Sequence, residues 1–430
     1  MLLDFFRTKK DQPKAAGRKP ASRNRIKHAQ DKKNRFEKIP VDQLRIGMYV
    51  RELDIPWEES SFLFQGIDVK TQQDILDVQR QCKHVWVDYT EFRLANNKPD
   101  TITNAFTSSN SLIEVEDEYE DALDAHTQAR QVMTNIFQDI RLGGEVDVGQ
   151  IKQSVSGSVD SIMRNPDASL WLTRLQETDN YTAQHSLNVA ALSIITGRSL
   201  GLSKEEMQNL GVCAVMHDIG KAQLPQELFS KSQLTEDEKA LIKTHPQLGH
   251  KILQSSKNMY SGAADVALWH HEHVDGKGYP HGLTAEKIPL FAKIVAITDT
   301  YDSMTSQRPG TKTLSPSEGL DYLYALRGKR FDEELVLKFI DGIGIFPAGS
   351  IVEMTNGEVG IVLSSTKDKL KPKVILILDQ IKDAAIQQVI DLSQMTVDTA
   401  GKPYQIKTTL RDGSYGIVVD EFQRAGLRIG

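Results

Sequence analysis

Two histidine-rich runs, each beside an apolar helical segment, constrain this chain most strongly. The first is His217–Lys221, which reads HDIGK, and the second is His270–Pro280, which reads HHEHVDGKGYP. Eight of the eleven histidines fall between His185 and His281, a crowding that histidines used as core or surface filler would not produce. Imidazole with carboxylate and no nearby cysteine favours Fe, Mn or Zn in a catalytic centre over structural zinc. The middle of the chain is therefore predicted to be a helical bundle that holds metal for hydrolysis.

Length and composition narrow the class of protein. The 430 residues suffice for two or three domains with buried cores. No apolar run approaches the roughly 18 residues that span a bilayer, and the charge at Asp4 interrupts the apolar start. Two cysteines, Cys82 and Cys213, offer no disulfide framework. We expect a cytoplasmic protein.

The charge is distributed unevenly along the chain. Residues 1–40 hold thirteen Lys and Arg against four Asp and Glu, so they carry +9 of a net charge of −6 and the rest carries −15. Such an arm suits an acidic lipid surface, nucleic acid or an acidic partner, and the alternative is a solvated, disordered tail. The acidic remainder argues against nucleic acid as the main partner. Peripheral membrane contact through the arm remains an expectation.

Periodicity predicts a mainly α protein with two small parts that contain strands. The expected order is a basic disordered arm at 1–38, a small α+β module at 39–98, a linker with an acidic helix at 99–147, a helical catalytic domain at 148–342, and a β-rich extension at 343–430.

Individual elements follow from the same patterns. In the module we expect strands at 48–50 and 84–87 and a helix at 69–79; in the catalytic domain, helices at 151–163, 187–200, 205–215 and 236–253, and a buried helix at 291–298 that leads into Asp299; in the extension, a hairpin at 350–363 and a strand at 373–378. Residues 97–112 are predicted to be a linker, and Asn165 is predicted to cap a helix break.

The first run has the geometry of a shared metal ligand. His217 and Asp218 on one helix would project about 100° apart, so the carboxylate is free to bridge to a second ion. Lys221 lies one turn further on, where its ammonium can reach the same cavity and meet a phosphate; the alternative is a solvent-facing lysine. In the second run a single histidine would suggest a core residue, whereas tandem His270 and His271 favour ligands.

Together these runs closely resemble those of the HD-GYP phosphodiesterases, which belong to the HD superfamily of metal-dependent phosphohydrolases. The matching residues are His217, Asp218, the run His270–Pro280 and the later Asp299, and the likeness covers roughly residues 150–342. The best-known substrate of that family is cyclic di-GMP. More weakly, Leu44–Val50, Trp57 and Phe62 resemble a small domain of unknown function that is often fused in front of HD-GYP domains in bacteria.

The resemblance implies a set of ligands and two divalent ions, Fe or Mn. The implied metal ligands are His185, His217, Asp218, His245, His270, His271 and Asp299, with Asp218 bridging. Tyr181 stands where three-metal members have a glutamate, which favours two ions. His250, His273 and His281 fall at positions that the family does not use for metal.

The same resemblance implies the reaction. A hydroxide that bridges the ions would attack phosphorus, with Asp218 and Lys221 as catalytic residues, giving linear pGpG, GMP or both. Lys221, Tyr279, Arg308 and Lys312 are the expected substrate contacts, although Gly310 replaces the family's aromatic residue there. Alternatives are hydrolysis of another cyclic dinucleotide or nucleotide, or a non-catalytic sensor of cyclic di-GMP. A diguanylate cyclase or other signalling protein at the Gly-Tyr-Pro loop and a homodimer are further expectations.

Overall fold

The computed structural model describes residues 36–45, 48–55, 67–69, 72–88, 113–175, 181–231, 233–306 and 313–424. The predictions made for most of the basic arm and its membrane contact, for the linker at 97–112, and for Trp57, Phe62, Arg308, Gly310 and Lys312 lie outside these residues. Within them, no helix is long and apolar enough to cross a membrane. The chain divides into two compact units, Met1–Ala105 and Phe106–Gly430.

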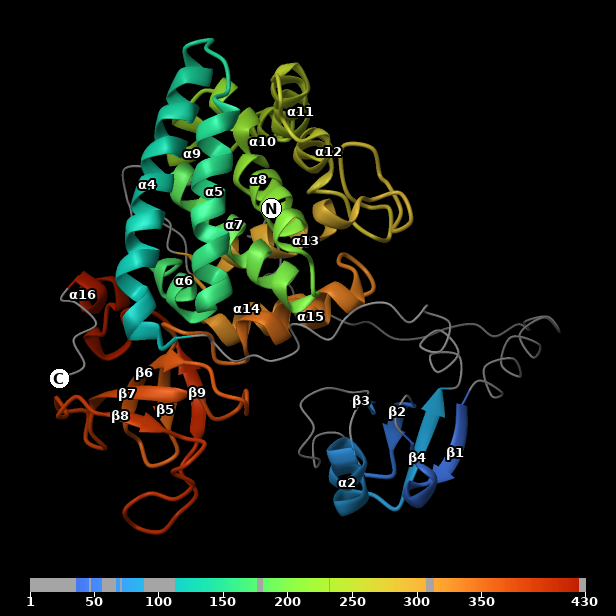
Figure 1. The fold of residues 1–430 in the computed structure, drawn as a ribbon, viewed down its shortest axis with the longest axis vertical. Coiled ribbons are helices and arrows are strands. Elements are labelled where there is room, and N and C mark those ends of the chain that lie inside the picture. Colours follow the sequence, from blue (N-terminus) through green and yellow to red (C-terminus); the bar gives the residue numbers. More distant parts are fainter. Residues whose placement is uncertain are drawn as a thin grey trace, which may run out of the picture. The chain divides into compact units, whose positions relative to one another are not determined.

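The described part of the first unit is an antiparallel sheet with one helix (Figure 1). Its strands are β1 (Phe36–Pro40), β2 (Tyr49–Leu53), β3 (Ile67–Asp68) and β4 (His84–Asp88) in the order β1-β4-β2-β3, with the 3-10 turn η2 (Val41–Gln43) and helix α2 (Gln72–Gln81). Val78 of α2 packs with Val50, Val85 and Val87 of the sheet in one buried cluster. The predicted strands and helix are therefore present, and β1 begins three residues inside the predicted arm because it pairs with β4.

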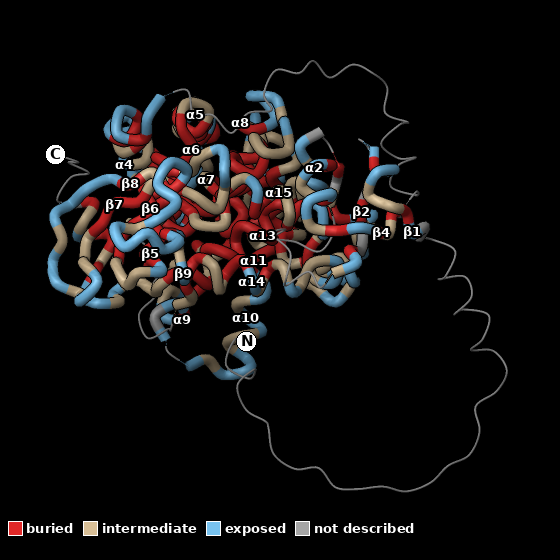
Figure 2. Tube along the Cα trace, turned by 90° about the horizontal axis from the view of Figure 1, so that it is seen from below, coloured by how far each residue is buried: buried red, intermediate tan, exposed pale blue. Residues whose placement is uncertain are grey.

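The second unit is mainly helical. Its helices are α4 (Val115–Arg141), α5 (Val148–Arg164), α6 (Pro166–Leu172), α7 (Tyr181–Ser199), α8 (Lys204–Met216), η4 (Ile219–Gln223), α9 (Glu227–Ser230), α10 (Glu236–Ile242), α11 (His245–Ser255), α12 (Ser261–Trp269), α13 (Leu290–Thr305), α14 (Pro316–Ala325) and α15 (Glu333–Ile343). Figure 2 colours the centre of this unit red, where α13 lies among the other helices. Twelve of the sixteen residues of α13 are buried, so the helix that carries Asp299 runs through the core.

Local sequence explains where several helices begin. Ser203 and Thr235 each accept a hydrogen bond from the backbone amide of the glutamate three residues later. The carboxylate of that glutamate accepts one in turn from the backbone amide of the capping residue, so both form capping boxes. Asn165 ends α5 and caps α6, whose first residue is Pro166, as the sequence predicts.

Three details of the sequence prediction are wrong. The amphipathic stretch 236–253 is two helices rather than one, because Pro246 lacks the N–H that would bond to the Ile242 carbonyl. Helix α7 begins at Tyr181 rather than Leu187. His217 and Asp218 do not lie inside one helix: α8 ends at Met216 and a 3-10 turn follows Asp218.

A five-stranded antiparallel sheet packs on the helical bundle. Its strands are β5 (Ile351–Met354), β6 (Val359–Ser364), β7 (Lys373–Leu378), β8 (Val389–Asp391) and β9 (Ile406–Leu410) in the order β8-β7-β6-β5-β9, followed by η5 (Ser414–Gly416) and α16 (Val419–Arg424). The predicted hairpin of β5 and β6 and the predicted strand β7 are present. The Trp171 indole donates to the Leu363 carbonyl at 2.8 Å, and Asp167 accepts from Ser365, so α6 is fastened to the sheet. The mainly α fold with small β parts is confirmed.

Candidate metal centre

A close approach between η4 and α11 brings the first run to its partners. A Cβ on Gly220 would lie 2.0 Å from the carbonyl oxygen of His245 and 2.5 Å from the amide nitrogen of Gly249. Only glycine fits there, and the contact places Asp218 beside His245. The glycine of the HDIGK run is therefore explained by backbone packing.

The seven residues that the resemblance implies as ligands lie together in the helical unit. Their ligand atoms fall into overlapping groups within which all lie at most 4.8 Å apart: His185, His217 and Asp299; His217, Asp218 and His270; and His245, His270 and His271. All are buried except His271, which is partly buried. The first and last groups share no residue, so the cluster has two ends.

Asp218 stands between these two ends. Its Oδ2 lies 3.3 Å from His217 Nε2 and 3.6 Å from His185 Nε2. Its Oδ1 lies 3.2 Å from His245 Nε2 and 3.8 Å from His270 Nε2. Each oxygen of one carboxylate thus faces a different end, which is the arrangement of a bridging ligand.

Helix ends orient three of the histidines. His217 Nδ1 lies 2.6 Å from the Ala214 carbonyl and His270 Nδ1 lies 3.0 Å from that of Ala267, both in the last turn of a helix, where carbonyls lack helical partners. His245 Nδ1 lies 2.7 Å from the Ile242 carbonyl, which is the group that Pro246 leaves without an amide donor. Donation from Nδ1 leaves each Nε2 as the electron-pair donor toward the cluster.

The ionisation of the cluster suits cation binding. Burial and neighbouring imidazoles lower the pKa of His270 to about 3 and that of His271 well below its ordinary value, so both are neutral. Burial opposes ionisation of Asp218 and Asp299, but Lys221 and His217 around the first and His185 beside the second hold both pKa values well below the usual range. His185 is the exception: burial acts against its charge, yet Asp299 and Asp302 raise its pKa to about 9, so a metal ion bound by His185 displaces a proton.

Two buried atoms test whether a metal fits. His217 Nε2 and Asp218 Oδ1 are fully enclosed, and neither makes a hydrogen bond. Leaving such atoms unsatisfied is costly, whereas a divalent cation between imidazole and carboxylate would satisfy both. The donor set of histidine nitrogen and aspartate oxygen suits a transition metal.

The predicted catalytic lysine and the Gly-Tyr-Pro loop border the cluster. The Lys221 ammonium pairs with Asp218 Oδ2. The Tyr279 ring stacks on His271 with centroids 4.8 Å apart, and Lys243 Nζ lies 5.5 Å from the Tyr279 ring centroid. Tyr279 therefore covers a predicted ligand, and the Lys243 contact was not anticipated from the sequence.

Close packing shapes that loop. A Cβ on Gly278 would lie 2.4 Å from the Glu272 Cα, so a glycine is required. The buried Glu272 carboxylate accepts from the backbone amides of His281 and Leu283 at 2.7 and 2.9 Å. Glu272 thus fastens the loop instead of joining the cluster.

Sequence reasoning missed Asp302 and Asn188. Asp302 Oδ2 lies 2.6 Å from His185 Nδ1, and Asp302 Oδ1 accepts from Asn188 at 2.9 Å. The spacing of Asp299 and Asp302, three residues apart on one helix, places both on one face and was the available signal.

These observations define the class of metal-dependent hydrolases whose ligands project from several helices of a bundle. A family model described as HD domain matches residues 168–335, and a domain of unknown function, DUF3391, matches residues 36–151. The chain belongs to the HD-GYP family of HD-domain phosphodiesterases, in the branch that carries this N-terminal domain.

Three curated relatives illustrate the similarity. A cyclic di-GMP phosphodiesterase of Pseudomonas aeruginosa is 32% identical over 84% of this chain and 89% of its own length. The cyclic di-GMP phosphodiesterase response regulator RpfG of Xanthomonas campestris is 38% identical, over 39% of this chain and 45% of that protein. A 3'3'-cGAMP-specific phosphodiesterase of Vibrio cholerae is 34% identical over 36% of each chain.

Proposed function

We propose that this chain is a cyclic di-GMP phosphodiesterase that works with two divalent ions, Fe or Mn, bound by His185, His217, Asp218, His245, His270, His271 and Asp299. The observation that carries the proposal is the position of Asp218, whose two oxygens face the two ends of the cluster at 3.2 to 3.8 Å. The P. aeruginosa relative supports the substrate, because its similarity extends over most of both chains.

The two kinds of side chain at the cluster have different roles. When bound, the ions supply Lewis acidity to the phosphate oxygens and lower the pKa of a water molecule. Asp218 would hold both ions, and Asp299 with the histidines would fix their positions. Lys221, once its ammonium turns from Asp218 to the substrate, neutralises negative charge that develops on phosphate. The hydrolysis product is linear pGpG, GMP or both.

The proposal is tested with purified full-length chain reconstituted anaerobically with Fe²⁺ or Mn²⁺. Cyclic di-GMP, linear pGpG and 3'3'-cGAMP are supplied separately, and products are separated by chromatography. We expect hydrolysis of cyclic di-GMP that disappears with a chelator and in Asp218→Ala. Absence of hydrolysis with every divalent ion, while two ions are bound, would favour the sensor alternative.

A second substrate is favoured by the V. cholerae relative, which is specific for 3'3'-cGAMP. The two cyclic dinucleotides carry the same phosphodiester chemistry and differ in one base. The kcat/KM ratio for the two substrates decides between them, and a ratio in favour of 3'3'-cGAMP would replace the proposed substrate while leaving the metal centre unchanged.

The Gly-Tyr-Pro loop also offers a place for a protein partner. Lys277 and His281 are exposed and mark the solvent-facing side of the loop. We propose that this side contacts a signalling protein such as a diguanylate cyclase, or a second copy of this chain. Sedimentation of the purified chain tests the homodimer, and Lys277→Glu should weaken a partner contact without loss of hydrolysis.

A further inference from the structure

We propose that Asp302, Asn188, Gln184 and His126 form a support chain that positions the metal ligand His185 and ties it to helix α4. The inference rests on the metal centre of the proposed function but not on its substrate. Asp302 and Asn188 are positioning residues in this proposal, because they act through His185.

His185 occupies a different position in its helix from the other three oriented histidines. His217, His245 and His270 sit at helix ends or breaks and use spare backbone carbonyls, but His185 lies inside α7, where the helix itself uses the carbonyls. A side chain must therefore hold its Nδ1–H, and Asp302 does so at 2.6 Å. A carboxylate on Nδ1 fixes the tautomer and orientation of the ring and makes Nε2 a stronger donor to metal.

Asp302 is itself held by further side chains. This carboxylate is buried, so its oxygens need hydrogen-bond partners within the protein. Its Oδ1 accepts from Asn188 Nδ2 at 2.9 Å and from Ser306 Oγ at 2.6 Å, while Oδ2 accepts from His185. Asn188 therefore holds Asp302 from α7, one turn away from the histidine that Asp302 orients.

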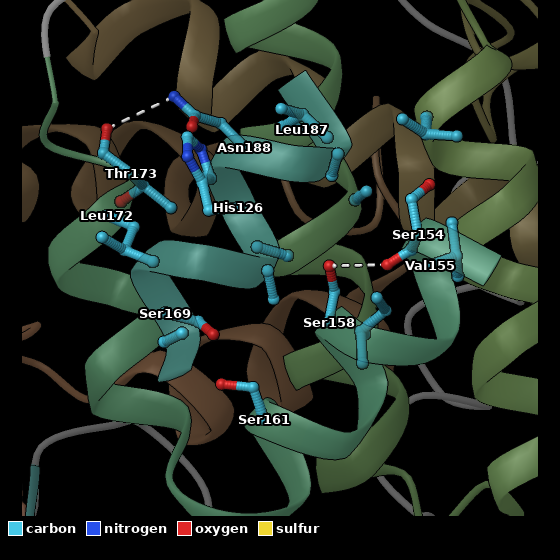
Figure 3. Close-up of a pocket in the computed structure, with 17 residues that line it drawn as sticks. His126, Ser154, Val155, Ser158, Ser161, Ser169, Leu172, Thr173, Leu187 and Asn188 are labelled. Atoms are coloured by element: carbon cyan, nitrogen blue, oxygen red, sulfur yellow. Dashed lines mark hydrogen bonds between the residues drawn. The ribbon is translucent and has the colours of Figure 1, made fainter. Parts of the chain in front are cut away.

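Gln184 extends these contacts to α4. Gln184 Nε2 donates to Asn188 Oδ1 at 2.8 Å and lies 3.2 Å from His126 Nε2, so one amide group joins the two side chains. Figure 3 shows His126 of α4 beside Asn188 of α7 at one end of a cavity, with the bond from Asn188 to the Thr173 carbonyl drawn. The cavity wall is otherwise made largely of alanine and serine, including Ala122, Ala125, Ser154 and Ser158.

The support chain ends on α4, a helix outside the part that matches the HD domain. Helix α4 lies before the part that matches the HD domain and inside the part that matches DUF3391. It packs on α5, α6, α7 and η4, and η4 carries Lys221. A displacement of α4 would therefore move His185. In this way the region before the HD domain would control how much metal the site binds.

The test is metal binding by the full-length chain. Metal-depleted protein is titrated with Mn²⁺ by calorimetry, and electron paramagnetic resonance separates isolated from coupled Mn²⁺. The variants are Asp302→Asn, Asn188→Ala and His126→Leu. The matched control is Ser193→Ala, because the buried Ser193 bonds to Thr298 at 2.8 Å and so joins the same two helices, α7 and α13, about two turns along α7 from His185.

We expect Asp302→Asn and Asn188→Ala to weaken Mn²⁺ at the His185 end by roughly 10- to 100-fold and to reduce the coupled signal. His126→Leu removes one outer hydrogen bond, so a loss of roughly three- to tenfold is expected. Ser193→Ala should bind two ions as the wild type does.

The unfolding midpoint of each metal-free variant separates misplaced ligands from misfolding. The proposal is overturned when Asn188→Ala and Asp302→Asn fold and bind both ions with wild-type affinity, or when Ser193→Ala loses as much affinity as they do. A variant that fails to fold leaves the decision to the other, which removes a different link. Failure of the wild-type chain to bind Mn²⁺ at all would instead contradict the metal centre itself.

Discussion

The two ends of the metal cluster are held in different ways. At one end, His245 and His270 use carbonyls that helix termini and Pro246 leave without partners. At the other end, His217 also uses a helix-terminal carbonyl, but His185 lies inside a helix and depends on Asp302, a side chain of α13. The first arrangement is set by where the chain breaks its helices, and the second by side chains that two helices bring together.

Because of this difference, the two ends should be sensitive to different substitutions. A backbone carbonyl cannot be removed by a substitution at its own residue, so the His245 end should tolerate changes in surrounding side chains. The His185 end should respond to any change that moves α4, α7 or α13. The predictions below are ordered by the size of the expected effect.

The largest effect is expected at the shared ligand. Asp218→Ala should remove both ions and lower kcat/KM by about 10³-fold or more, because both ends lose a carboxylate oxygen. Metal analysis and steady-state kinetics measure this, with the exposed Asp237→Ala of α10 as the control. Retention of both ions and of hydrolysis in Asp218→Ala would remove the basis for a bridging role.

Single-end variants test whether the ends are separable. His185→Ala should lose the ion of its own end and His270→Ala that of the other, each with a fall in kcat/KM of roughly 10²- to 10³-fold. Counting bound Mn²⁺ per chain checks the result, and one remaining ion is expected in each variant. Loss of both ions from either variant would mean that the cluster binds metal as one cooperative unit.

A smaller effect is expected at the loop. Tyr279→Ala removes the ring that stacks on His271, so Mn²⁺ affinity at the His245 end should fall by roughly 2- to 10-fold. Tyr279→Phe is the matched control, since it keeps the ring and should keep the affinity. Equal affinities for the alanine and phenylalanine variants would show that the stacking contributes nothing to the ligand.

The smallest effect is expected far from both ends, at the ion pair of Glu318 and Arg411 that joins α14 to β9. Hydrogen bonds from Arg411 lower the pKa of Glu318 from 4.5 to about 2, so the stabilisation is complete above pH 4.5 and is lost as the pH falls toward 2. The carboxylate is 42% exposed, so screening limits the free energy to about 1 kcal/mol or less.

Unfolding of the metal-free chain by denaturant across that pH range measures this contribution. Glu318→Gln should flatten the acid limb while Mn²⁺ affinity at neutral pH stays unchanged. A change in metal affinity would connect the sheet to the cluster and break the expected separation.

Sequence reasoning reached His217, Asp218, His270 and His271 because they occur in runs, whereas the family resemblance supplied His185, His245 and Asp299. The paired motifs lie together as expected, whereas their binding of metal remains a prediction. The supports were harder to foresee. Asn188 reaches Asp302 through packing of α7 on α13, and His126 reaches Gln184 through packing of α4 on α7, and no local pattern encodes either contact. The prediction of a single helix at 236–253 is wrong because Pro246 removes a backbone amide without changing the amphipathic pattern. The carbonyl that lacks this amide is the one that orients His245.

The fold was predictable where periodicity is strong, as in the hairpin of β5 and β6 and the buried α13. The start of α7 was missed because its first turn is polar and contains Gln184 and His185, which serve the site instead of the core. Polar residues at buried helical positions thus weakened the helical pattern in the sequence, and the same residues belong to the candidate site.

Trp171 gives the strands a role beyond that of an appendage. Its side chain is fully buried, its indole nitrogen donates to β6, and its carbonyl oxygen accepts from Gln423 of α16. A chain cut after residue 342 would expose the large apolar ring of Trp171, which is now fully buried, to water. The segment beyond the HD domain is therefore part of its hydrophobic core, and the smallest autonomous folding unit is expected to extend to α16.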